Sequence, residues 1–76
     1  MTTKERRDYL KGRIISKYEQ LKYKAVMSYH DGEISADDLR MRKKFLTREE
    51  NLRLAEIDEM SYDKIKRRYE KLTGNR

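Results

Sequence analysis

The sequence predicts an all-α protein in which a long N-terminal helix packs with two or three short helices, as a helical hairpin or bundle. Three observations support this class: apolar residues recur at helical spacing, proline is absent from the 76 residues, and capping signals separate the segments. Charged residues make up 45% of the chain and apolar residues 36%, against roughly 25% and 45–50% in typical globular domains. The single domain, residues 1–76, must therefore have a thin core.

The first helix is predicted over residues 3–30. Thr2 and Glu5 match a capping box at its start, and Gly32 follows its end, where glycine adopts positive φ without a Cβ penalty. A helix of this length extends beyond what short neighbours would cover, so we expect it to form the seam of a homodimer. Its apolar face consists of Leu10, Ile14, Ile15, Tyr18, Leu21, Ala25, Val26 and Tyr29.

The second helix is predicted over residues 36–46, after a turn over residues 31–35. Ser35 is its expected N-cap, and Ile34 with Leu39 forms a hydrophobic staple. Met41 and Phe45 lie on a different side from Leu39, so the helix has two apolar faces. We expect it to be sandwiched within the fold; contact of one face with a partner is the alternative.

A third helix is predicted over residues 48–58. Thr47 and Glu50 match another capping box, which indicates a bend at Thr47; one continuous helix through this position is the alternative. One side of this segment is charged and is expected to face solvent. That side carries Glu49, Arg53 and Glu56.

The last helix is predicted over residues 62–72, with Ser61 as its N-cap and Gly74 after its end. Its apolar and basic residues form two adjacent stripes, so one side can pack while the other faces phosphates. Ordinary i, i+4 charge pairs on a solvated helix are the alternative explanation of the basic stripe. The apolar stripe consists of Tyr62, Ile65, Tyr69 and Leu72, and the basic stripe consists of Lys64, Arg67, Arg68 and Lys71.

Residues 50–72 resemble the generic helix-turn-helix of DNA-binding proteins. The resemblance depends on Ala55 as the small residue where the two helices cross, on Met60 and Ile65 as core positions, and on Ser61 as the cap. It departs from the pattern at Glu59, where a glycine is usual. The resemblance implies DNA contacts from the exposed N-terminal half of the last helix, at Tyr62, Lys64 and Arg67, with Arg68 and Lys71 placed for the DNA backbone.

Residues 14–46 resemble the short helical hairpin called SHOCT, whose pattern is a helix, a glycine, Ile-Ser or Ile-Thr, acidic residues and a lysine-rich helix. Gly32, Ile34-Ser35 and Asp37-Asp38 carry this resemblance. It implies an oligomerisation or docking hairpin, because apolar side chains one helical turn apart are the anchors of helix-in-groove contacts. The implied contact residues are Tyr23, Met27, Met41 and Phe45.

The net charge of +6 is unevenly distributed. Residues 1–29 carry eight basic and three acidic side chains, residues 30–60 carry six and nine, and residues 61–76 carry six and two. This asymmetry favours a polyanionic partner, although solubility alone would also explain the charge. We therefore expect a small basic nucleic-acid-binding protein with a regulatory or accessory role, which contacts DNA rather than RNA through its first and last helices.

The alternative function is a helical interaction module, an adaptor or inhibitor that docks on a larger protein; its composition resembles that of small phage or mobile-element accessory proteins. The chain has no cysteine and one histidine, His30, which fits a helix C-terminus and predicts no metal site. The sequence shows no Gly-rich phosphate loop and no nucleophile–base set, which predicts no catalytic residue, cofactor or small-molecule substrate. No apolar run is long enough for a membrane span, so a cytoplasmic protein is expected.

Overall fold

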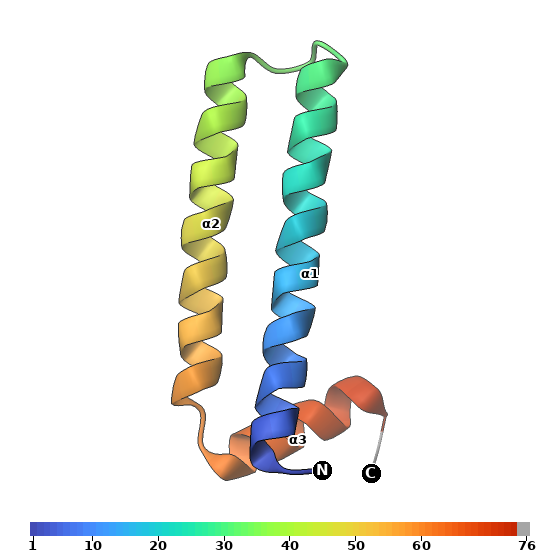
Figure 1. Ribbon diagram of the computed structural model, residues 1–76, viewed down its shortest axis with the longest axis vertical. Helices are drawn as coiled ribbons and strands as arrows, with labels where there is room; N and C mark the ends of the chain where they lie inside the picture. Colours follow the sequence, from blue (N-terminus) through green and yellow to red (C-terminus); the bar gives the residue numbers. More distant parts are fainter. Residues whose placement is uncertain (75–76) are drawn as a thin grey trace.

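The computed structural model describes residues 1–74, which form three α-helices: α1 (Thr3–His30), α2 (Ala36–Glu59) and α3 (Tyr62–Thr73). Helices α1 and α2 form a long antiparallel hairpin, and α3 crosses the end of it that holds the N-terminus (Figure 1). The principal extents of the molecule are 45 × 22 × 14 Å. The predicted all-α class, with a long N-terminal helix packed against shorter ones, is confirmed.

The helix starts follow the local capping signals. At the start of α1, Thr2 Oγ1 accepts a hydrogen bond from the Glu5 backbone N–H at 3.2 Å, and Glu5 Oε1 accepts one from the Thr2 N–H at 3.1 Å. The hydrogen bond from the Thr2 backbone N–H, followed by interaction with the Thr2 hydroxyl, lowers the pKa of the Glu5 carboxyl below its ordinary value. Ser35 and Ser61 accept the backbone N–H three residues further on, and Gly32 follows α1 with φ of 77°.

Helix α2 is continuous, so its predicted division into helices over residues 36–46 and 48–58 is wrong. The capping pattern at Thr47 is not used, because no glycine or proline interrupts residues 36–59 and the segment packs along α1. A continuous α2 also removes the premise for a dimer seam on α1. Residues of the α1 stripe such as Tyr18 and Ala25 are already buried within the single chain.

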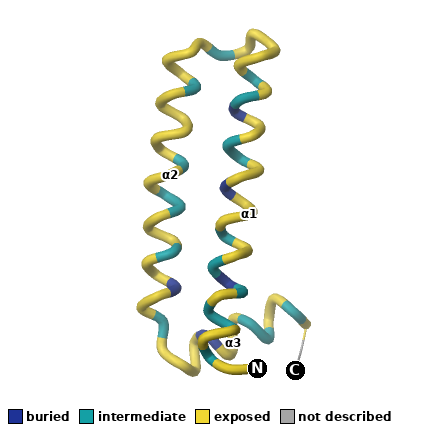
Figure 2. Tube along the Cα trace, in the orientation of Figure 1, coloured by how far each residue is buried: buried dark blue, intermediate teal, exposed yellow. Residues whose placement is uncertain are grey.

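The core is thin and is confined to the sides of the helices that face one another (Figure 2). Leu10, Ile57 and Ile65 form one cluster, to which each helix contributes one residue. Farther along the hairpin, Tyr18 and Ala25 of α1 are buried as well. The sandwiched position expected for the first half of α2 is wrong, because a two-helix hairpin leaves the far side of α2 without a neighbour. Two large apolar side chains there are exposed, those of Met41 and Phe45.

The centre of the hairpin contains a polar contact between α1 and α2. The Tyr18 hydroxyl donates to Glu49 Oε1 at 2.6 Å, which places Glu49 between the helices and corrects the expectation that it faces solvent. The hydrogen bond to the Glu49 carboxylate and burial of the ring raise the pKa of Tyr18 above its ordinary value near 10. Arg53, an exposed residue one turn farther along α2, has a raised pKa, mainly through its interaction with Tyr18.

The raised pKa of Tyr18 makes stability dependent on alkaline pH. Above pH 10 the unfolded chain loses the phenolic proton before the folded chain does, so the stabilisation is complete below pH 10 and declines as pH rises through the folded pKa. The Tyr18→Phe variant lacks this proton and is expected to lose less stability than the wild type above pH 10. Urea denaturation of both proteins at neutral pH and above pH 10 measures this difference; equal losses would contradict the assignment.

Candidate nucleic-acid interface

Helix α3 docks through the centre of its apolar stripe. Ile65 is fully buried against Leu10 and Ile57. The Tyr69 ring meets the Tyr9 ring of α1 edge to face, with ring centroids 5.1 Å apart and an interplanar angle of 76°. Of the four residues predicted for this stripe, the two at its ends are exposed instead. These are Tyr62 and Leu72.

Helix α3 packs mainly on α1, and from the end of α2 only Ile57 joins its buried cluster among the residues described. The main contacts of α3 are with α1, and Ala55, where the helix-turn-helix resemblance places the helix crossing, is exposed. Tyr9, which lies off the apolar stripe of α1, is half-buried in this contact. The orientation of α3 therefore depends on α1 side chains that are distant in sequence.

The cations predicted to contact nucleic acid lie on the exposed side of α3. We call Lys64, Arg67, Arg68 and Lys71 the basic face of α3, and all four are exposed. The ion pairs among residues 1–74 join Lys11 to Asp58, Lys22 to Glu50 and Arg40 to Asp37, so none of them includes the basic face. The Arg67 Nε–H donates to the backbone carbonyl of Asp63, at 3.4 Å. Tyr62, the fifth predicted contact residue, is exposed at the start of the same helix.

Several basic residues of α1 have structural roles that sequence reasoning missed. Arg7 Nη1 donates to the carbonyls of Ile57 at 2.6 Å and Asp58 at 2.8 Å, and Nη2 donates to the Met60 carbonyl at 3.3 Å. Arg7 thereby caps the C-terminus of α2, which has no basic residue in its last turn and no glycine after it. The absence of these local capping residues from the sequence was the signal that another part of the chain must cap α2. Lys11 is also engaged, with Asp58 at 3.0 Å.

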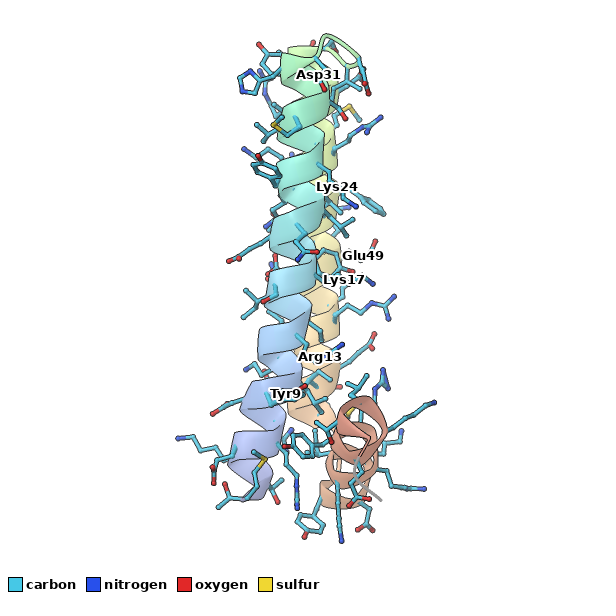
Figure 3. The ribbon with its side chains drawn as sticks, turned by 90° about the vertical axis from the view of Figure 1, so that its right-hand side faces the viewer. Tyr9, Arg13, Lys17, Lys24, Asp31 and Glu49 are labelled. Carbon is cyan, nitrogen blue, oxygen red and sulfur yellow. The ribbon has the colours of Figure 1, made fainter. Side chains whose placement is uncertain are left out.

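Other exposed cations lie along one side of α1, from its α3 end toward the turn of the hairpin. Tyr9, Arg13, Lys17 and Lys24 follow one another along the side of α1 that faces the viewer in Figure 3. Arg13 Nη1 donates to the Tyr9 hydroxyl at 3.3 Å, and Tyr9 in turn contacts α3. Exposed positive charge therefore continues from α3 onto this side of α1, through Arg13 and Lys17.

The residues predicted for a protein partner are divided between two places. Met41 and Phe45 border a groove between α1 and α2, which Leu21 and Ala25 of α1 also line. Tyr23 lies in a separate shallow depression formed by α1 alone, and neither it nor Met27 lines the groove. All four predicted residues are exposed, but they do not form one surface.

Within residues 1–74, no group of three or more acidic or histidine side chains is arranged to hold a metal ion. None of the helices described is long and apolar enough to cross a membrane. Comparison of the chain with protein-family models, curated proteins and solved structures gives no match. Only the residues and their geometry therefore indicate a function.

Proposed function

We propose that this protein binds nucleic acid, and duplex DNA in preference to RNA, through the basic face of α3, in a regulatory or accessory role. The observation that supports this most strongly is that the four cations are exposed and are absent from the ion pairs found in residues 1–74. A regular helix fits the major groove of B-DNA, whereas the major groove of A-form RNA is too deep and narrow to admit side-chain reading.

The mechanism is phosphate neutralisation by a helix held at a fixed angle. The four residues occupy positions i, i+3, i+4 and i+7 of a helix that is about 18 Å long, so their charges point to one side. Ile65 and Tyr69 fix the opposite side against α1, which keeps the basic face directed outward. Each phosphate contact releases condensed counterions, so affinity should fall steeply with salt.

Two further groups extend this surface. Tyr62, 55% exposed, lies in the first turn of α3, where its ring can contact a base or the sugar–phosphate backbone. On α1, Arg13 and Lys17 add exposed positive charge beside α3. Positioning through phosphates is the main role proposed for these residues, and sequence reading is limited to Tyr62, Lys64 and Arg67.

A paired charge reversal tests the site. The double variant Lys64→Glu and Arg67→Glu should lose retention on a duplex DNA column at low salt, because two phosphate contacts become repulsive. The matched control is Lys24→Glu with Lys43→Glu, which changes the net charge equally at exposed positions on the hairpin. The control should remain bound. Equal retention of the two variants, or equal loss, would show that the basic face of α3 is not the binding site.

Docking on a larger protein is the second candidate function. The specific observation that favours it is the exposure of Met41 and Phe45 beside the groove between α1 and α2. An apolar contact of this kind should change little with salt, in contrast to phosphate binding. Capture assays at low and high salt would therefore separate the two candidates.

A further inference from the structure

Helix α2 carries a row of exposed apolar side chains on the side turned away from its buried contact with α1. Met41 and Phe45, at one end of the row, also border the groove between the two helices. Met41, Phe45 and Leu52 are 70%, 62% and 61% exposed, and Ala55 continues the row. Their spacing of four, seven and three residues keeps them on one side of the helix over about 21 Å. We call these four residues the outer stripe of α2. A stripe of this spacing is the pattern by which one helix packs along another.

After its acidic first turn, which holds Asp37 and Asp38, the charges of α2 are segregated along the helix. Residues 40–48 contain five basic side chains and no acidic one, whereas residues 49–59 contain five acidic side chains and one arginine. A second α2 packed antiparallel would place the basic half of each helix beside the acidic half of the other. A parallel arrangement would place like charges together, which is unfavourable.

We propose that the protein forms an antiparallel homodimer through the outer stripe of α2, in place of the α1 seam expected from the sequence. We identify the partner as a second copy of this chain because, in an antiparallel pair of α2 helices, the basic segment of each helix lies beside the acidic segment of the other. In the register that places Phe45 beside Leu52 of the second copy, the two-fold axis passes between residues 48 and 49. Arg42 then lies within about one turn of Glu56 and Glu59 of the second copy.

The charges needed for this contact are available in the single chain. Glu50 and Asp58 pair with lysines of α1, and Glu49 accepts the Tyr18 hydrogen bond. Glu56 and Glu59 are exposed. Arg42 is exposed and has no ion pair among the residues described. The dimer would also add burial to a monomer whose own core is thin.

This arrangement has a consequence for α3. A two-fold axis perpendicular to the plane of the two α2 helices leaves α3 and its copy on the same side of the dimer, near opposite ends. If the proposed nucleic-acid function holds, one duplex can contact both basic faces. The dimer itself does not depend on that function, because its test is the association state without nucleic acid.

Sedimentation equilibrium of the full chain, from micromolar to millimolar concentration, tests the proposal. The wild type should show a reversible monomer–dimer equilibrium, and Phe45→Ser with Leu52→Ser should remain monomeric with unchanged helicity, because both side chains are exposed in the monomer. The matched control, Ile15→Ser on the partly exposed side of α1, should dimerise as the wild type does. A wild type that stays monomeric, or a dimer lost only in the Ile15 variant, would overturn the proposal.

A charge swap tests the register. Arg42→Glu and Glu56→Arg should each weaken the dimer several-fold, and the double swap should restore it, because the two positions meet only between copies. They lie 14 residues apart on one helix, about 21 Å, and cannot pair within the chain. Failure of the double swap to restore association would overturn this register.

Cysteine cross-linking tests the direction of packing in a chain that has no natural cysteine. Arg48→Cys lies beside the proposed two-fold axis and should form a disulfide-linked dimer on mild oxidation. Met41→Cys lies away from the axis and should not form one. Cross-linking of both variants with equal yield would indicate parallel packing and overturn the proposal.

Discussion

Replacing Ile65 with alanine is expected to detach α3 from the hairpin, at a cost of about 2–4 kcal/mol in the free energy of unfolding. Ile65 has no exposed surface and is the α3 member of the cluster that joins the three helices. A chain of this size has only about 3–5 kcal/mol of net stability from its core, so the loss is a large fraction of the total. A 12-residue helix without this contact is marginal in water, so α3 should also lose helicity.

Urea denaturation and hydrogen exchange measure these two effects. The control is Ile15→Ala, which removes the same atoms from a side chain that is 39% exposed, and should cost less than about 1 kcal/mol. Hydrogen exchange should show lost protection in α3 for the Ile65 variant alone. Equal destabilisation by the two substitutions would contradict the docking of α3 through Ile65.

Replacing Arg7 with alanine is expected to cost about 2–3 kcal/mol, because hydrogen bonds from a charged donor contribute more than neutral ones. The Arg7 guanidinium donates to three carbonyls at the end of α2, and those groups have no basic side chain in their own turn. The positive charge also lies at the negative end of the α2 dipole. The last turn of α2 should fray, which disturbs the position of α3 just after it.

Lys4→Ala is the matched control for Arg7, because it removes one positive charge from an exposed position in the first turn of the same helix. Its effect on stability should stay within about 0.5 kcal/mol. Urea denaturation gives the two free energies, and amide exchange at residues 57–60 reports on the cap. An Arg7 variant as stable as the Lys4 variant would exclude a capping role.

The features predictable from sequence were those with a local cause. The helix starts at Thr3, Ala36 and Tyr62 were confirmed because each depends on a cap whose side chain and backbone partner lie within three residues. The same local pattern failed at Thr47. There the propensity of the surrounding residues and packing along α1 keep the helix continuous, and a capping pattern has no effect without a break in the backbone.

The features that could not be predicted depend on contacts between distant segments. The guanidinium of Arg7 lies 50 or more residues from the carbonyls it binds, so no local pattern could assign it to them. Glu49 was assigned to solvent from its place on one helix, because the position of Tyr18 on the other helix was not known. The exposure of the basic face of α3 was easier to predict than these long-range contacts. Cations on a short amphipathic helix remain in water unless another segment supplies an acidic partner.

The salt dependence of duplex DNA affinity tests the central claim most directly. If the four cations of the basic face each contact a phosphate, they should contribute about −3.6 to the slope of log K plotted against log salt concentration, and contacts from Arg13 and Lys17 would make the slope steeper. Neutralising Lys64 and Arg67 with glutamine should reduce the steepness of this slope by about 1.8, whereas Lys24→Gln with Lys43→Gln should leave it unchanged. A slope that is flat in the wild type, or that the α3 substitutions do not alter, would contradict nucleic-acid binding through this face.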